Sequence, residues 1–147
     1  MTSWREEISE AAQDDLDGLV EPVWDFAEHQ LLARGEFFPF AFVVGTDGEQ
    51  SMAAAEVGDD KPESTEVIDV LNAGLTEKRD DLRATAVVAD VHLPDLDTDA
   101  IRIVLEHREG VALEIMIPYR LQPITREVAF GELLVSEAER VVWGTPS

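Results

Sequence analysis

The chain of 147 residues contains no cysteine, which excludes disulfide bonds, thiolate metal sites and a cysteine nucleophile. It has no apolar run near the roughly 18 residues that a membrane-spanning helix requires. Residues 1–7 lack the basic start and the apolar stretch of a secretory signal peptide. We therefore expect a cytoplasmic protein that binds no membrane.

Basic residues are scarce: 11 Lys and Arg stand against 32 Asp and Glu, giving a net charge of −21 at pH 7. Affinity for nucleic acid comes from cationic side chains that neutralise phosphates, so we expect no direct nucleic-acid binding. Two explanations of the acidity involve no recognition, namely a salt-rich cytoplasm that screens repulsion and a GC-rich genome. The third is an acidic inhibitor that masks a basic site on a nucleic-acid-processing partner. The spread of the acids along the chain favours the first two.

Catalytic and cofactor motifs are also missing. The sequence has no Gly-x-Gly-x-x-Gly or Gly-x-x-x-x-Gly-Lys phosphate loop and no serine in a Gly-x-Ser-x-Gly elbow. Its three histidines, His29, His92 and His107, are too few and too scattered to indicate a zinc site. His92 shares a strand face with Asp90, but no nucleophile accompanies this pair. We expect no catalytic residue and no cofactor.

One short stretch offers candidate metal ligands. Asp95, Asp97 and Asp99 alternate along the chain, and Glu106 follows at the twelfth position, as in an EF-hand calcium loop. The sixth position is Ala100, where that loop needs glycine, and the next residues alternate as a strand that would carry Glu106 away. The pattern favours a polar loop between strands. A metal-binding or enzymatic role for the three aspartates is the alternative.

The first third of the chain has helical periodicity. An apolar residue recurs at every fourth position from Trp4 to Val20. Gly18 and Pro22 interrupt the pattern, and proline is best tolerated at the start of a helix. The sequence therefore predicts two helices, over residues 3–16 and 20–34.

Further helix signals follow. Gly35 lies where a left-handed C-terminal cap belongs. After an acidic loop over residues 56–66, a third helix is predicted to begin at Asp60 or Ser64 and to end near Asp81.

Four of the six phenylalanines fall within residues 37–42. As an extended chain, this stretch points Phe38, Phe40 and Phe42 to one face and Phe37 to the other, so both faces are apolar. Such a strand belongs in the interior of a sheet, and this favours a core role. A protein interface and a small-molecule pocket are the alternatives. Asp47-Gly48 predicts a hairpin turn, with a returning strand over residues 51–57.

From residue 84 the apolar period changes to two and predicts four strands, over residues 84–93, 100–107, 111–121 and 128–135. A three-residue loop that ends in Gly110 would pair Leu105 with Leu113 and Ile103 with Ile115. This register aligns every apolar residue on one face and gives glycine the left-handed position.

Together these elements predict an α+β fold with an antiparallel sheet of five to six strands and helices packed on one face. The element order is α-α-β-β-α-β-β-β-β. We expect a single domain over residues 1–143 and a frayed tail over residues 144–147.

A helix that runs into Gly35-Glu36-Phe37-Phe38-Pro39-Phe40 and then a strand resembles a motif in small uncharacterised bacterial and archaeal proteins. A later strand that contains Ile117-Pro118-Tyr119 is part of the same resemblance, which implies no activity and no ligand.

We therefore expect a non-catalytic module that binds a protein partner or itself, a homodimer being one form. The candidate interface residues are Phe38, Phe40, Phe42, Met116 and Trp143.

Overall fold

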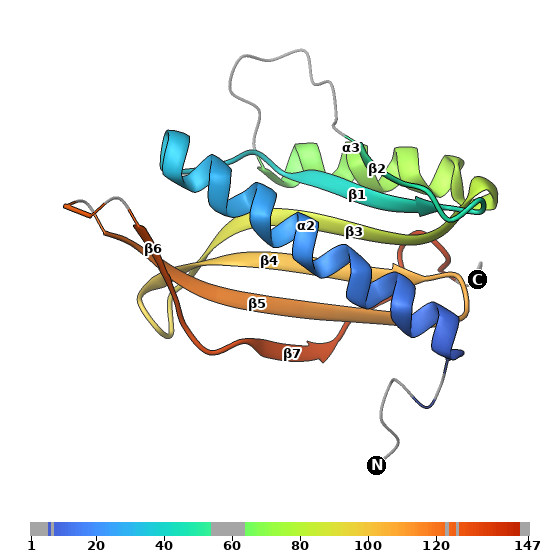
Figure 1. Ribbon diagram of the computed structural model, residues 1–147. Helices are drawn as coiled ribbons and strands as arrows, with labels where there is room; N and C mark the ends of the chain where they lie inside the picture. Colours follow the sequence, from blue (N-terminus) through green and yellow to red (C-terminus); the bar gives the residue numbers. More distant parts are fainter. Residues whose placement is uncertain (1–5, 7, 54–63, 123, 126, 145–147) are drawn as a thin grey trace.

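Seven strands form one antiparallel sheet in the computed structural model, which describes residue 6 and residues 8–53, 64–122, 124–125 and 127–144. The sheet order is β2-β1-β3-β4-β5, and the outer edge of β5 pairs with both β6 and β7 (Figure 1). The predicted α+β class and antiparallel sheet are confirmed. The strands are β1 (Phe40–Gly45), β2 (Gln50–Ala53), β3 (Leu82–Leu93), β4 (Thr98–His107), β5 (Val111–Gln122), β6 (Glu127–Phe130) and β7 (Leu134–Glu137).

The helix α2 (Glu10–Arg34) is continuous, so the prediction of two helices over residues 3–16 and 20–34 is wrong. Pro22 lies inside it and has no N–H to donate to the carbonyl of Gly18. The side-chain amide of Gln50, from β2, donates to that carbonyl at 2.9 Å instead. A bond from a distant strand thus replaces the one that proline removes. Gly35 caps the helix with φ 79°, as predicted.

The two helices lie on opposite faces of the sheet. α2 packs on the face that carries Phe40 and Val44 of β1, whereas α3 (Ser64–Glu77) packs on the face that carries Ala41 and Val43. The expectation that the helices share one face is therefore corrected. A strand that is apolar on both sides needs cover on both sides, and a helix supplies each. A short 3₁₀ turn, η1 (Arg79–Asp81), connects α3 to β3.

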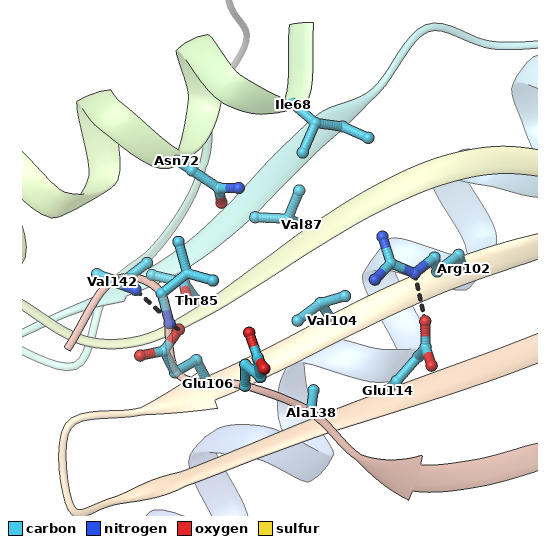
Figure 2. Close-up of a pocket in the computed structure, with 12 residues that line it drawn as sticks. Ile68, Asn72, Thr85, Val87, Arg102, Val104, Glu106, Glu114, Ala138 and Val142 are labelled. Atoms are coloured by element: carbon cyan, nitrogen blue, oxygen red, sulfur yellow. Dashed lines mark hydrogen bonds and ion pairs between the residues drawn. The ribbon is translucent and has the colours of Figure 1, made fainter. Parts of the chain in front are cut away.

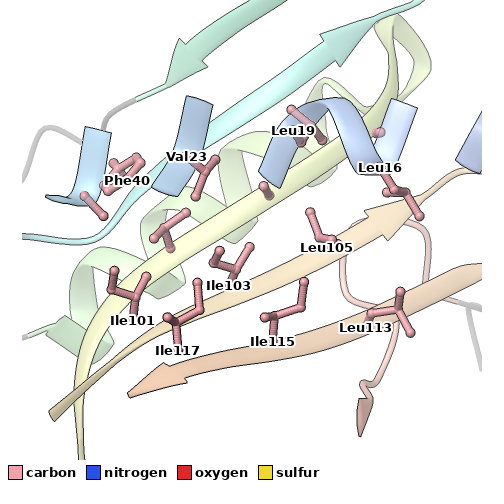
Figure 3. Packing of buried hydrophobic residues seen from close by; sticks show 14 of the residues in the cluster. Leu16, Leu19, Val23, Phe40, Ile101, Ile103, Leu105, Leu113, Ile115 and Ile117 are labelled. Atoms are coloured by element: carbon pink, nitrogen blue, oxygen red, sulfur yellow. The ribbon is translucent and has the colours of Figure 1, made fainter. Parts of the chain in front are cut away.

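The larger core lies between α2 and the centre of the sheet (Figure 3). α2 presents apolar residues at helical spacing to the alternating side chains of β4 and β5. Burying each such aliphatic side chain contributes about 1.5–3 kcal/mol. The central contributors are Leu16, Leu19, Val23, Ile101, Ile103, Leu105, Leu113, Ile115 and Ile117.

The predicted register of the β4–β5 hairpin is confirmed. Leu105 pairs with Leu113 and Ile103 with Ile115 across β4 and β5, and Gly110 has φ 120°. Gly48 takes φ 86° between β1 and β2. The end of the predicted strand over residues 51–57 and most of the acidic loop lie outside the described residues.

The strand predicted over residues 128–135 is two short strands, because the ladder along β5 is interrupted at Pro118. The carbonyl of Pro118 accepts from the Gly131 N–H at 2.7 Å, but proline has no N–H to return. β6 and β7 pair with β5 on either side of this point. The predicted frayed tail lies outside the described residues except for Gly144.

Candidate binding site on the open half of the sheet

α3 covers only part of its face of the sheet. α3 lies over β1 and β3 (Figure 2), and its apolar cluster also takes in Ala53 of β2 and the C-terminal residues Val142 and Trp143. Among the described residues, this cluster contains no residue of β4, β5 or β7. Five exposed or part-exposed side chains there form what we call the open face. They are Arg102, Val104, Glu114, Met116 and Leu134, which strand alternation and pairing place on one side.

A groove of about 370 Å³ lies between α3, strands β3–β5 and the C-terminal segment. Its lining mixes apolar and polar groups, as small-molecule and peptide sites do. The lining residues are Ile68, Asn72, Thr85, Val87, Arg102, Val104, Glu106, Glu114, Ala138, Glu139, Val141 and Val142.

An ion pair crosses the floor of the groove. Arg102 Nε of β4 donates to Glu114 Oε1 of β5, and both side chains are partly exposed. A pair in contact with solvent contributes only about 0–1 kcal/mol, so a docking partner can rearrange it at little cost.

One wall of the groove is the C-terminal strap, residues 138–144. The buried carboxylate of Glu106, 2% exposed, accepts the backbone N–H groups of Val141 and Val142 at 2.9 Å and of Trp143 at 2.7 Å. Val142 is 1% exposed in the α3 cluster, and Trp143 packs against that cluster. The sequence pattern placed Glu106 at the twelfth position of a calcium loop and gave no indication of this role.

The metal candidates do not form a site. Across the described residues, no group of three or more His, Asp or Glu side chains could hold a metal ion. His92 Nδ1 lies 3.0 Å from Asp99 Oδ1, its cross-strand partner, and Nε2 lies 3.9 Å from Asp97. Asp95 is exposed in the turn between β3 and β4, whereas Glu106 lies near the far end of β4. The EF-hand spacing is therefore not realised, and His92 pairs with Asp99 rather than Asp90.

Asp90 of β3 pairs instead with Tyr119 of β5, near the loop that follows the C-terminal end of α2. The Tyr119 hydroxyl donates to Asp90 Oδ1 at 2.6 Å, and the Phe37 N–H also donates to this carboxylate. Burial raises the pKa of Asp90 above its ordinary value of 3.8, and the Tyr119 bond offsets part of the rise. Burial likewise raises the pKa of the Tyr119 phenol. The pair joins the loop after α2 to β3 and β5.

The raised pKa of Asp90 predicts a pH effect on stability. Because the folded state holds this proton more tightly than the unfolded state, the contribution of Asp90 falls as pH rises through the window above 3.8. Relative to Asp90→Asn, the natural chain is expected to be more stable near pH 4 than near pH 7. Urea midpoints of both proteins across this range test it, and a difference independent of pH would contradict it.

A second buried pair joins α2 to the β4–β5 hairpin. His107, 2% exposed, places Nε2 3.0 Å from Asp15 Oδ2, and the Glu109 N–H donates to Nδ1 at 3.1 Å. Nδ1 is thus an acceptor, and Nε2 carries the hydrogen that faces Asp15. Arg83 donates to the other oxygen of Asp15 at 2.8 Å. Both imidazole nitrogens have structural partners, so this pair anchors the helix.

The phenylalanine stretch divides between core and surface. Phe40, 3% exposed, lies 4.7 Å from Phe26, 5.6 Å from Phe37 and 5.9 Å from Phe42 between ring centroids. Phe38 is 51% exposed. Phe38 was predicted to share the face of Phe40, and Phe37 to lie on the opposite face. Instead Phe37 packs against Phe40 and Phe38 is exposed, because the strand begins only at Phe40.

The candidate interface residues therefore fall into two groups. Phe40 and Phe42 belong to the core cluster beneath α2, and Phe38 lies just before β1. Met116 lies on the open face, and Trp143 lies in the strap on the same side of the sheet. The structure thus brings Met116 and Trp143 to one face and separates them from the phenylalanines.

Acidic side chains are concentrated along the solvent side of α2. Six carboxylates recur at intervals of three or four residues, opposite the buried stripe, and form what we call the acidic ridge. Beside it, Trp24 and Phe130 make an edge-to-face contact with centroids 5.1 Å apart. The ridge consists of Glu10, Asp14, Asp17, Glu21, Asp25 and Glu28.

No protein-family model matches this chain, and no curated protein or solved structure does so either. Neither α2 nor α3, the long helices of the described residues, has the length and apolar character of a bilayer-crossing helix.

Proposed function

We propose that this chain is a non-catalytic cytoplasmic protein-binding module and that its partner docks on the open face. The observation that carries the proposal is that the helix layer ends at β3. A sheet face in a globular domain is normally covered by a second layer. Here Val104 and Met116 stay part-exposed and Leu134 is exposed beside a groove, as the side chains of a docking surface are.

The charge of the chain indicates the chemistry of the partner. A net charge of −21 attracts a basic protein over long range and raises its association rate at low salt. A second copy would bring the same charge and would be repelled. We therefore favour a basic partner that offers apolar side chains to Val104 and Met116.

Arginine substitutions on the open face test this proposal. Val104→Arg/Met116→Arg places bulk and positive charge where a basic partner would sit, whereas Leu32→Arg makes the same kind of change on exposed α2. Each protein is immobilised on a resin and exposed to an extract of the source cells. We expect the natural chain and Leu32→Arg to retain the same protein, and the double variant to lose it. Retention by all three would contradict the proposal, provided circular dichroism shows that each is folded.

The acidic ridge favours a second candidate, an inhibitor that fills a basic site on a nucleic-acid-processing protein. From Glu10 to Glu28 the ridge extends about 27 Å at 1.5 Å per residue, long enough to cover a nucleic-acid-binding groove. Replacing Asp17, Glu21 and Asp25 by their amides would abolish retention in this case, while the double arginine variant would still retain the partner. The two candidates thus give opposite results in one experiment.

A further inference from the structure

The C-terminal strap is held to the domain by few bonds. Its first residue, Ala138, donates to the carbonyl of Ala112 on β5 at 3.0 Å. Beyond it, in the part of the chain that the structure describes, the hydrogen bonds from the strap to the sheet are the three that end on Glu106. One carboxylate therefore provides all of these later polar contacts.

The closed strap also carries unfavourable terms. The Glu106 carboxylate is removed from water. Arg102, the cation of the groove lining, does not compensate its charge, because it is paired with Glu114. Arg140 Nε is buried without a hydrogen-bond partner. When the strap lifts, the Glu106 carboxylate and the Arg140 Nε–H are both hydrated again. Opening therefore leaves neither a buried charge nor a buried donor without a partner. The closed state is favoured mainly by the three N–H bonds and by the burial of Val142.

We propose that residues 139–144 open and close as a unit over the groove, with Glu106 as the latch. Opening withdraws Val142 from the apolar cluster formed by Val67, Leu71 and Val87, and so extends the groove beneath α3. A partner that docks in the groove then competes with the strap for this space. This last consequence rests on the proposed function, whereas the opening itself does not.

Hydrogen exchange of the natural chain gives the first test. Local opening predicts that the amides of Val141, Val142 and Trp143 exchange about a hundredfold or more faster than those of Ile103 and Ile115 in the central strands. Exchange as slow as in the central strands would show that the strap opens only with global unfolding, and would overturn the proposal.

A matched pair of variants gives the second test. Glu106→Gln removes the charge and one acceptor oxygen, whereas Glu139→Gln makes the same change on an exposed strap residue whose carboxylate accepts no hydrogen bond among the described residues. Loss of charged hydrogen bonds predicts about tenfold faster exchange at residues 141–143 in Glu106→Gln and no acceleration there in Glu139→Gln. Unchanged strap exchange in Glu106→Gln, or equal acceleration in Glu139→Gln, would refute the latch.

The isolated chain suffices for both measurements. If the exchange results refute the latch, the arginine variants still test docking on the open face. If the arginine variants refute docking, the exchange results still test the latch.

Discussion

Phe40→Ala is expected to lower the free energy of unfolding by about 3–5 kcal/mol, the usual loss when a buried aromatic ring is removed. The Phe40 ring is 3% exposed and contacts three other rings, from α2, the preceding loop and β1 itself. Since domains of this size are stable by about 5–15 kcal/mol, the variant would be marginally folded. Urea unfolding at fixed salt, followed by circular dichroism, measures the loss.

Phe38→Ala is the matched control, because it removes the same ring two residues away. Its side chain is 51% exposed, so we expect a change within about 0.5 kcal/mol. A loss at position 38 as large as that at position 40 would contradict the assignment of Phe40 to the core and Phe38 to the surface.

The second large effect is expected for Asp15→Ala, at about 2–4 kcal/mol. The Asp15 carboxylate accepts from His107 and from Arg83, and His107 is only 2% exposed. Without it, a buried imidazole N–H has no acceptor, and α2 loses its polar connection to the end of β4. The midpoint of thermal or urea unfolding reports the loss.

Asp14→Ala controls for helix propensity and charge, because it makes the same substitution one residue earlier. Asp14 is exposed on the acidic ridge, so removing it relieves repulsion and should leave stability equal or slightly higher at low salt. Equal losses at positions 14 and 15 would show that the buried pair contributes nothing.

The apolar pattern was sufficient for the register of the β4–β5 hairpin. Only one loop length aligns Leu105 with Leu113 and Ile103 with Ile115, because a slip of one residue would turn the apolar set toward water. Local chemistry also determined the turns, since Gly48 and Gly110 take the positive φ angles expected of them.

What the sequence could not provide depends on contacts between distant residues. Gly18 and Pro22 predict a break between two helices. The helix is continuous because the side chain of Gln50, 28 residues after Pro22, supplies the donor that the Gly18 carbonyl lacks. The apolar faces of residues 40–44 show that both sides are covered but not which helix covers each.

Buried charges were missed for a related reason. Glu106 continues the polar positions of β4, and its pattern is that of an exposed residue. It is buried because amides 35 to 37 residues later in the chain close over it. His107 likewise has no local signal for its bond to Asp15, which is 92 residues away.

The central claim is that the partner docks on the open face, and site-specific photo-crosslinking tests it most directly. Benzoylphenylalanine would replace Met116 on the open face or Phe38, an exposed residue just before β1, and each variant would be irradiated in the source cells. We predict an adduct with another protein from position 116 and none from position 38. An adduct from position 38 alone, or an adduct of twice the chain mass from position 116, would contradict the account.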